Sequence, residues 1–397
     1  MVQKRKITLG HLDINATGKK YVNDALENNR LSYGPYSQKF ETSFAKEHGC
    51  DYGVFTASGT CALQIALATL KETYGYQSGD EVIVPATTFI ATSNVVLQND
   101  MKPVFVDVDP RTFNIDPTKL EAAITSRTCA IIPVHLFGLP ADMPAIMDIA
   151  EIYELNVIED SCETMFASID GERVGSWGDL ACFSTYVAHL IVGGVGGLVT
   201  TNFEFYADLC RSYMQHGRNS AYTNIDQDDS EEAAVLQDMI SRRYKFERVG
   251  YSYRATELEA AIALSEFEDW PRNIAIRRQN AEYLTARLAD LAALIQTPTI
   301  PEGYEHSFMM YPMVLSSFVS RNDFLLHLET NGIETRYLFP LLSMPVYRNL
   351  FPRQEYNFPV AMRLAEHGFF IGMHQGLTPI DMDYVSEVIH EYFEDRL

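Results

Sequence analysis

Short apolar segments alternate with helical patterns through the first half of the chain. Apolar segments occur at 81–85, 103–108, 130–135 and 156–160, and helical patterns at 89–97, 117–124 and 143–153. This alternation predicts a buried, mostly parallel sheet with helices on both faces. Ligands of such sheets bind at the carboxyl ends of the strands, so polar residues at those ends are candidate functional residues.

The pattern changes after residue 270, where a long arginine-containing helix is expected and a compact α+β arrangement follows. We therefore predict a large domain over 1–270, including the N-terminal segment, and a bridging helix with a small C-terminal domain over 271–397. The other expected helices are 11–31, 40–47, 203–214, 256–270, 274–291, 321–330, 358–366 and 381–393. The other expected strands are 306–315, 332–336 and 368–371, with a turn at 32–37 and an acidic surface loop at 224–232.

Composition narrows the class of protein. With 47% hydrophobic residues the chain can bury a sizeable core, and no apolar run reaches the ~18 residues of a membrane span. A net charge of −22 argues against binding to nucleic acid or to anionic membranes. The six cysteines lack metal-ligand spacing, and no apolar segment follows the basic N-terminus. We therefore expect reduced thiols, no metal site, no signal peptide and a cytoplasmic location.

A glycine-rich stretch carries the strongest signal for function. Residues 180–183 and 198–201 have strand patterns, and the loop between them contains Gly193, Gly194, Gly196 and Gly197. So many glycines in one loop indicate unusual backbone angles or close approach to a ligand. Further upstream, Ser58-Gly59-Thr60 opens an apolar helical pattern, which is typical of a helix N-cap or of an anion site.

These motifs occur in the order found in a known family. Ser58-Gly-Thr, Glu159-Asp160, Phe183-Ser184 with Gly194-x-Gly-Gly, and Gly250-Tyr-x-x-Arg254 follow one another along the chain. In this order the sequence resembles the DegT-type sugar aminotransferases. The resemblance covers about residues 7–395 and implies an α/β, aspartate aminotransferase-like fold, known as pyridoxal 5′-phosphate (PLP) fold type I.

The resemblance also implies roles for individual residues. It implies that Ser58, Gly59 and Thr60 bind the cofactor phosphate. It also implies that Asp160 contacts the pyridine nitrogen and that Phe89 stacks on the cofactor ring. The further cofactor-binding residues are Glu163, Ser184 and Ser252, the last in place of the usual asparagine that reaches the partner subunit. The implied substrate-binding residues are Gly34, Tyr186, Arg254, Arg336 and His374. From the residues alone, Asp160 is equally compatible with a helix N-cap and Phe89 with core packing.

The position of the family's cofactor-binding lysine holds His189. Imidazole has no primary amine, so it cannot hold PLP covalently, but it can still move protons near neutral pH. No lysine lies between residues 119 and 245 to replace it. A second departure is Glu163, where the aminotransferases carry glutamine. Both departures resemble the family's lysine-less 3-dehydratase branch, typified by GDP-4-keto-6-deoxymannose 3-dehydratase.

We therefore expect a 4-keto-6-deoxy-sugar 3-dehydratase that binds PLP or pyridoxamine 5′-phosphate (PMP) non-covalently, with His189, Asp160 and Glu163 as its catalytic residues. L-Glutamate would recharge the cofactor, the second substrate would be a nucleotide-linked keto sugar, and a homodimer would share its active sites. Two alternatives stay open: an aminotransferase that tolerates histidine, and a non-catalytic binding relative. His189 could also be a packed loop histidine or an engineered replacement of lysine.

Overall fold

The computed structural model describes residues 4–219, 232–242 and 244–394. Its larger sheet has seven strands in the order β1-β9-β8-β5-β4-β2-β3, and only β9 runs antiparallel to its neighbours. The mostly parallel sheet is therefore confirmed. These strands are β1 (Tyr52–Thr56), β2 (Glu81–Pro85), β3 (Lys102–Val106), β4 (Thr128–Ile131), β5 (Asn156–Asp160), β8 (Leu180–Ser184) and β9 (Gly197–Thr201).

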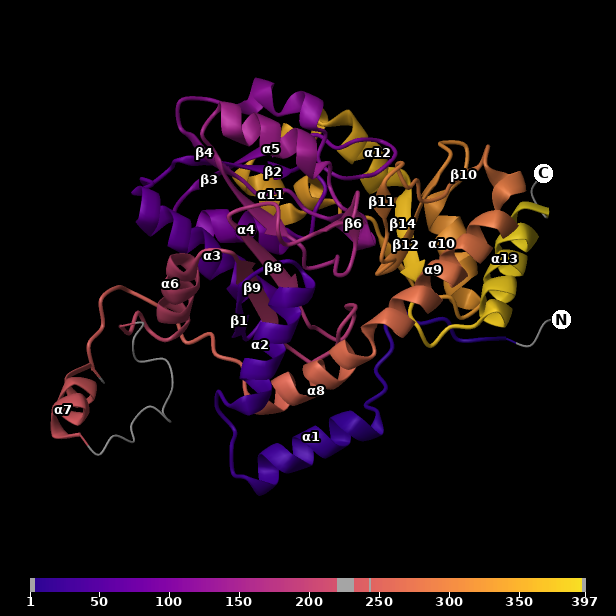
Figure 1. Cartoon of the computed structure of the whole chain (residues 1–397). Helices are drawn as coiled ribbons and strands as arrows, with labels where there is room; N and C mark the ends of the chain where they lie inside the picture. Colours follow the sequence, from indigo (N-terminus) through magenta and orange to yellow (C-terminus); the bar gives the residue numbers. More distant parts are fainter. Residues whose placement is uncertain (1–3, 220–231, 243, 395–397) are drawn as a thin grey trace.

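Helices cover both faces of this sheet, as Figure 1 shows. One face packs on α3 (Gly59–Tyr74), α4 (Ile90–Gln98) and α6 (Glu204–Met214). The opposite face packs on α2 (Pro35–Glu47), α5 (Met143–Ile152) and α8 (Glu257–Glu268), with α1 (Ala16–Glu27) against α8. Because both faces are covered, the strands are apolar throughout rather than alternating, as the sequence pattern indicates.

A second, four-stranded antiparallel sheet has the order β10-β12-β14-β13. Its strands are β10 (Ile295–Gln296), β12 (Met310–Leu315), β13 (Thr335–Tyr337) and β14 (Gly368–Gly372). A separate apolar core joins this sheet to α9 (Trp270–Arg287), α10 (Arg321–Thr330) and α13 (Pro379–Glu394). The boundary between residues 270 and 271 falls between the strands of the two sheets and stays a prediction.

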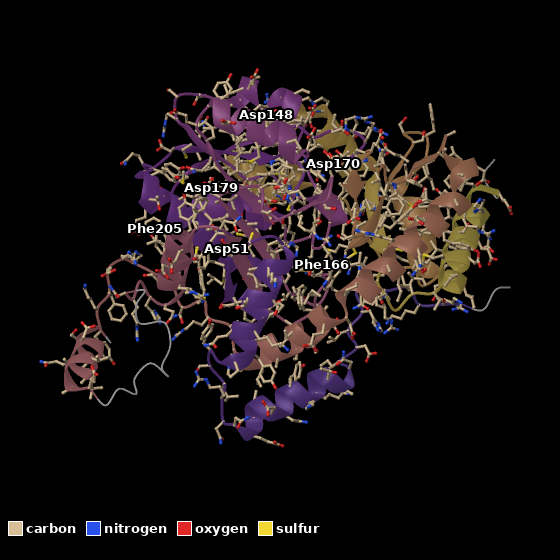
Figure 2. The ribbon with its side chains drawn as sticks, in the orientation of Figure 1. Asp51, Asp148, Phe166, Asp170, Asp179 and Phe205 are labelled. Carbon is tan, nitrogen blue, oxygen red and sulfur yellow. The ribbon has the colours of Figure 1, made fainter. Side chains whose placement is uncertain are left out.

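A small sheet and an aromatic stack are among the contacts that join the two halves of the chain. A three-stranded sheet pairs β11 (Tyr304–Glu305) with β6 (Ser168–Ile169), which pairs with β7 (Glu172–Arg173). The fully buried ring of Phe166, labelled in Figure 2, stacks on Trp270 with centroids 4.3 Å apart. Since Trp270 begins α9, this stack fixes the start of the bridging helix against the larger sheet.

Several expected elements differ from the observed ones. The helix expected at 117–124 is only two 3₁₀ turns, Pro117–Lys119 and Glu121–Ala123. The strand expected at 306–315 begins at Met310, because Phe308 has a φ of +48°, which no strand residue can adopt. In place of the turn expected at 32–37, α2 begins at Pro35, where proline is favoured in a first helical turn.

Three short helices complete the described chain, and two of them were not expected. The two unexpected helices are α7 (Ala233–Arg242) and α11 (Pro345–Leu350). The third helix, α12 (Pro359–His367), matches the helical pattern expected at 358–366. The acidic loop expected at 224–232 lies almost wholly outside the described residues. In the described part of the chain no helix is both long and apolar enough to cross a membrane.

Candidate active site

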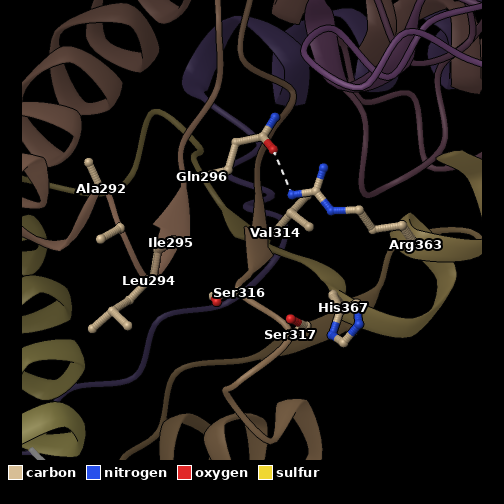
Figure 3. Close-up of a pocket in the computed structure, with 10 residues that line it drawn as sticks. Ala292, Leu294, Ile295, Gln296, Val314, Ser316, Ser317, Arg363 and His367 are labelled. Atoms are coloured by element: carbon tan, nitrogen blue, oxygen red, sulfur yellow. Dashed lines mark hydrogen bonds between the residues drawn. The ribbon is translucent and has the colours of Figure 1, made fainter.

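A cavity of about 400 Å³ lies where the loops after β1, β2, β5 and β8 meet the small antiparallel sheet. Eleven of the residues singled out in the sequence line it: Ser58, Gly59, Thr60, Phe89, Asp160, Glu163, Ser184, Tyr186, His189, Gly196 and Arg336. Because parallel strands bring their carboxyl ends to one edge, residues more than a hundred positions apart meet there. A second hollow, of about 490 Å³, lies beside β10 and β12 (Figure 3), and of the residues singled out in the sequence none lines it.

The N-terminus of α3 forms one end of the cavity. The Ser58 hydroxyl caps the helix by accepting the N–H of Cys61 (3.1 Å). A Cβ at Gly59 would lie 2.7 Å from the Cys162 Sγ, and one at Gly197 would overlap the backbone of Ser58 and Gly59. Only glycine allows the loop to approach the helix start this closely. The first-turn N–H groups of a 16-residue helix thus lie at this end of the cavity, an arrangement suited to binding an anion.

Asp160 ends β5 and is buried. Burial raises the pKa of its carboxyl, against hydrogen bonds that favour the charged form. The Thr92 hydroxyl donates to its Oδ2 (2.7 Å), and the Cys162 N–H donates to its Oδ1 (3.2 Å). The carboxylate is therefore fixed in orientation by α4 and by the loop that follows its own strand.

Glu163 lies in the same cavity but in a drier environment. Burial raises the pKa of its carboxyl to about 8, and the nearby Asp160 charge adds to this rise. Its only hydrogen bond in the described residues is to the Phe137 N–H, which donates to Oε2 (3.0 Å). Glu163 is therefore mainly protonated at neutral pH, so that it can donate a hydrogen bond as a glutamine amide would.

His189 lies in the loop between β8 and β9, beside Tyr186, whose carbonyl accepts its backbone N–H (2.9 Å). Burial lowers the pKa of the imidazole to about 4, so the ring is neutral at pH 7 and can accept a proton. Its Nδ1 is buried and has no hydrogen-bond partner among the described residues. None of the described residues lining the cavity is a lysine, and Lys245 pairs instead with Glu247 (3.2 Å).

Four of the predicted site residues do not line the cavity in this chain. Ser252 and Arg254 lie on the segment before α8, where the Arg254 guanidinium donates to the Ser252 hydroxyl (3.0 Å). Gly34 is buried at the start of α2, between Arg30 and Glu257. His374 is buried behind the N-terminal segment and contacts the Thr8 hydroxyl (3.2 Å). Their roles stay predictions.

The side of the cavity formed by the small sheet contains an aromatic cluster that sequence reasoning missed. Phe137 and Phe339 stack in parallel with centroids 5.3 Å apart, and Phe370 lies 5.1 Å from Phe137. Phe137 has a φ of +58°, an unfavourable angle for an aromatic residue that the surrounding packing imposes. No local pattern marks these residues, because they come from three segments far apart in sequence.

The residues present fit a pyridoxal phosphate cofactor. A glycine-lined helix N-terminus can hold the phosphate, a fixed carboxylate at a strand end can face a ring nitrogen, and Phe89 offers a half-exposed ring for stacking. A seven-stranded, mostly parallel sheet with this cavity, joined to a small α+β sheet, defines the aspartate aminotransferase-like architecture of PLP fold type I. Within the described residues no cluster of carboxylate, histidine or cysteine groups is arranged to hold a metal ion.

Comparison with known proteins narrows this class. Residues 12–390 match the DegT/DnrJ/EryC1/StrS aminotransferase family. A GDP-perosamine synthase from Caulobacter vibrioides is 34% identical over 390 residues, 97% of this chain and 98% of that protein. The structure of Escherichia coli GDP-4-keto-6-deoxy-D-mannose-3-dehydratase with bound hydrated PLP matches with a TM-score of 0.87 and 27% identity, covering 98% of this chain and 100% of that one.

A third match, a GDP-4-keto-6-deoxymannose-3-dehydratase with a trapped PLP–glutamate geminal diamine, has a TM-score of 0.85 and 26% identity, over 97% of this chain and 100% of that one. The chain belongs to the DegT/DnrJ/EryC1/StrS aminotransferase family. It is thus a PLP-dependent enzyme of the sugar aminotransferase family, which confirms the resemblance, the fold class and the cofactor expected from the sequence.

Proposed function

We propose that this protein is a PMP-dependent 3-dehydratase of a nucleotide-linked 4-keto-6-deoxy sugar, with L-glutamate as its second substrate. The observation that carries the proposal is His189, a neutral imidazole in the cofactor cavity where the family's lysine would lie. Histidine preserves proton transfer but cannot exchange an imine, so the product is released by hydrolysis. The overall reaction converts keto sugar and glutamate into 3-deoxy keto sugar, 2-oxoglutarate and ammonia.

Each residue of the cavity has a role in this proposal. PMP, when bound, supplies an amine and a ring that accepts electrons. Asp160 keeps the ring nitrogen protonated, and the glycine-lined start of α3 holds the phosphate. Neutral Glu163 would offer its carboxyl O–H as a hydrogen-bond donor to the cofactor. His189 takes and returns the proton at the cofactor carbon C4′ while the substrate's C3 hydroxyl leaves as water.

The aromatic cluster supports a 6-deoxy sugar. Phe137, Phe339 and Phe370 present no polar atom, so a hydroxyl buried against them would lose its hydrogen bonds at a cost of about 1–3 kcal/mol. A methyl group carries no such penalty. Arg336 provides a cation on the same side for an anionic group of a substrate. The dehydratase structures support both substrates, since they match this chain closely and one holds glutamate with PLP.

A second candidate function is transamination of the same class of sugar. The observation in its favour is that the GDP-perosamine synthase is 34% identical, against 27% and 26% for the two dehydratases. Both candidates use the same cofactor and glutamate, but one product loses an oxygen and the other gains a nitrogen. A non-catalytic relative would bind these ligands without turnover.

We also propose a homodimer with shared sites. Ser252 and Arg254 lie outside the cavity of their own chain, and both are exposed. Their family counterparts act across the subunit interface, and closed two-fold dimers are the commonest assembly. This arrangement would bring Ser252 to the partner's cofactor phosphate and Arg254 to the glutamate carboxylate.

The test is the mass of the product formed from PLP, L-glutamate and a panel of 4-keto-6-deoxy nucleotide sugars. We expect a 3-deoxy product, with 2-oxoglutarate and ammonia released. A 4-amino sugar that retains its 3-oxygen would establish the aminotransferase instead, and binding without turnover would establish the non-catalytic relative.

Two variants of His189 control this experiment. His189→Asn should slow turnover by on the order of 10²-fold or more while PMP still binds, because only the proton carrier is lost. His189→Lys restores a primary amine and should shift the product toward the amino sugar. Unchanged turnover of His189→Asn would contradict the role of the imidazole.

A further inference from the structure

The N-terminal segment 7–11 runs along the small sheet and ends against the active-site loop. The Ile7 N–H donates to the Gly332 carbonyl (2.9 Å), and the Glu334 N–H donates to the Ile7 carbonyl (2.9 Å). Ile7 is fully buried in the core of the small sheet. The beginning of the segment is therefore anchored as an additional strand-like edge beside β13.

The middle of the segment meets the cavity through Leu9, which lines it. The Leu9 N–H donates to the Oε2 of Glu334 (3.2 Å), and the Arg336 Nη2 donates to the Oε1 of the same carboxylate (2.7 Å). Arg336 also donates to the Thr335 carbonyl (2.7 Å). A single carboxylate thus holds both the backbone of the segment and the guanidinium that lines the cavity from the small sheet.

The far end of the segment is tied to two other elements. The Thr8 hydroxyl donates to the Gly10 carbonyl (3.0 Å), so it accepts from His374, whose Nε2 lies 3.2 Å away. A Cβ at Gly10 would lie 2.9 Å from the Val187 carbonyl oxygen. The segment therefore packs directly on the loop that carries His189, two residues before it.

We propose that Glu334 is a positioning residue that joins segment 7–11 to Arg336, so that seating of the segment and orientation of the guanidinium occur together. The ion pair is half-exposed and contributes little stability by itself. Its consequence is geometric: with the segment seated, Leu9 closes the cavity and Arg336 is held in one direction. The effect on substrates rests on the proposed function. The anion held by Arg336 is a glutamate carboxylate or the diphosphate of the nucleotide sugar.

The first measurement needs no turnover. Hydrogen–deuterium exchange of the PLP-loaded protein should show the Leu9 amide exchanging at least about tenfold faster in Glu334→Ala, because its acceptor is gone. Glu366→Gln, an exposed carboxylate of the same domain, is the matched control and should leave this exchange unchanged. Unaltered exchange of Leu9 in Glu334→Ala would overturn the proposal whether or not the enzyme is a dehydratase.

The second measurement tests the coupling to Arg336. Glu334→Ala should raise the KM of one anionic substrate by on the order of tenfold or more with kcat little changed. Thr8→Val loosens the segment without touching the ion pair, and should raise the same KM. If the KM for glutamate rises, an effect also visible in titrations of the cofactor absorbance, the anion held by Arg336 is the glutamate carboxylate. If the KM for the sugar rises, that anion is the diphosphate of the nucleotide sugar. Faster exchange of Leu9 with both KM values unchanged would refute the coupling.

A conservative variant separates positioning from packing. Glu334→Gln keeps the shape of the side chain and one acceptor oxygen, but its amide nitrogen cannot accept from either partner. It should therefore show an intermediate rise in KM. If Glu334→Gln leaves both the exchange of the Leu9 amide and the KM values unchanged, the segment is not joined to Arg336 through a carboxylate that accepts from both.

Discussion

Replacing Glu163 by glutamine removes a buried carboxyl whose pKa is raised from 4.5 to about 8. The folded protein binds this proton more tightly than the unfolded chain. Stability is therefore lost as pH rises from about 4.5 to about 8, and the loss is complete above that range. At 1.36 kcal/mol for each pH unit, the full effect is on the order of 5 kcal/mol at most.

Glutamine is the matched variant because it is uncharged at every pH and nearly the same shape. Its amide oxygen can still accept the Phe137 N–H that Glu163 accepts at 3.0 Å. We therefore expect the free energies of unfolding of the two cofactor-free proteins to differ by less than about 1 kcal/mol at pH 5. At pH 9 the Glu163→Gln protein should be more stable by several kcal/mol. His189 also titrates in this range, but it does so in both proteins and cancels in the difference.

The assay is urea unfolding followed by circular dichroism at pH 5, 6, 7, 8 and 9, with Glu366→Gln as an exposed control. A stability difference that does not change with pH would refute the reasoning, since it would show that Glu163 is ionised in the folded protein. A loss of stability in Glu163→Gln that is added as a constant offset to the expected pH-dependent difference would instead indicate that the amide does not fit the site.

Four further predictions concern the cofactor site and the dimer. Borohydride reduction followed by intact mass should leave no pyridoxyl adduct on the protein, and an adduct on Lys245 would redirect the mechanism. Sedimentation should show a dimer, and Ser252→Ala should weaken PMP binding by no more than about 1.5 kcal/mol, whereas an active monomer would contradict shared sites. Asp160→Asn, which removes the carboxyl group proposed to face the ring nitrogen, should lower kcat by on the order of 10²-fold, and an unchanged kcat would exclude that role.

Most of the residues that sequence reasoning placed in the cavity lie near the ends of parallel strands or at a helix start, whereas Arg336 lies in β13 of the small antiparallel sheet. Asp160 follows from its place at a strand end and Ser58 from its place at a helix start, whereas the family resemblance supplies Ser184. The three residues meet because the carboxyl ends of β1, β5 and β8 lie at one edge of the sheet. His189 and Glu163 follow from their positions in the same motifs. The sequence therefore predicts which residues line the large-domain side of the cavity and which position lacks a lysine.

The aromatic residues that line the cavity near the small sheet could not be predicted from strand ends or helix starts. Phe137 takes up a left-handed backbone conformation that no local pattern of residues indicates. Phe339 and Phe370 reach the cavity only through pairing of β13 with β14, which lie about thirty residues apart. Similarly, the pattern at 117–124 resembles a helix, but the chain forms two 3₁₀ turns between β3 and β4. Tertiary contacts decide each of these cases.

Two carboxyl groups share this cavity, and burial raises the pKa of both, but the hydrogen bonds around them differ. Asp160 accepts two hydrogen bonds, from Thr92 and Cys162, which favour its ionised form, whereas Glu163 accepts one backbone N–H and has its pKa raised to about 8. Repulsion between the two carboxylates increases the difference between their pKa values, because ionising one carboxyl makes it harder to ionise the other. A protonated ring nitrogen at Asp160 would hold that group charged and Glu163 neutral. The aminotransferases carry an uncharged glutamine at the position of Glu163. A neutral, protonated Glu163 can therefore occupy the same place beside the cofactor as that glutamine amide.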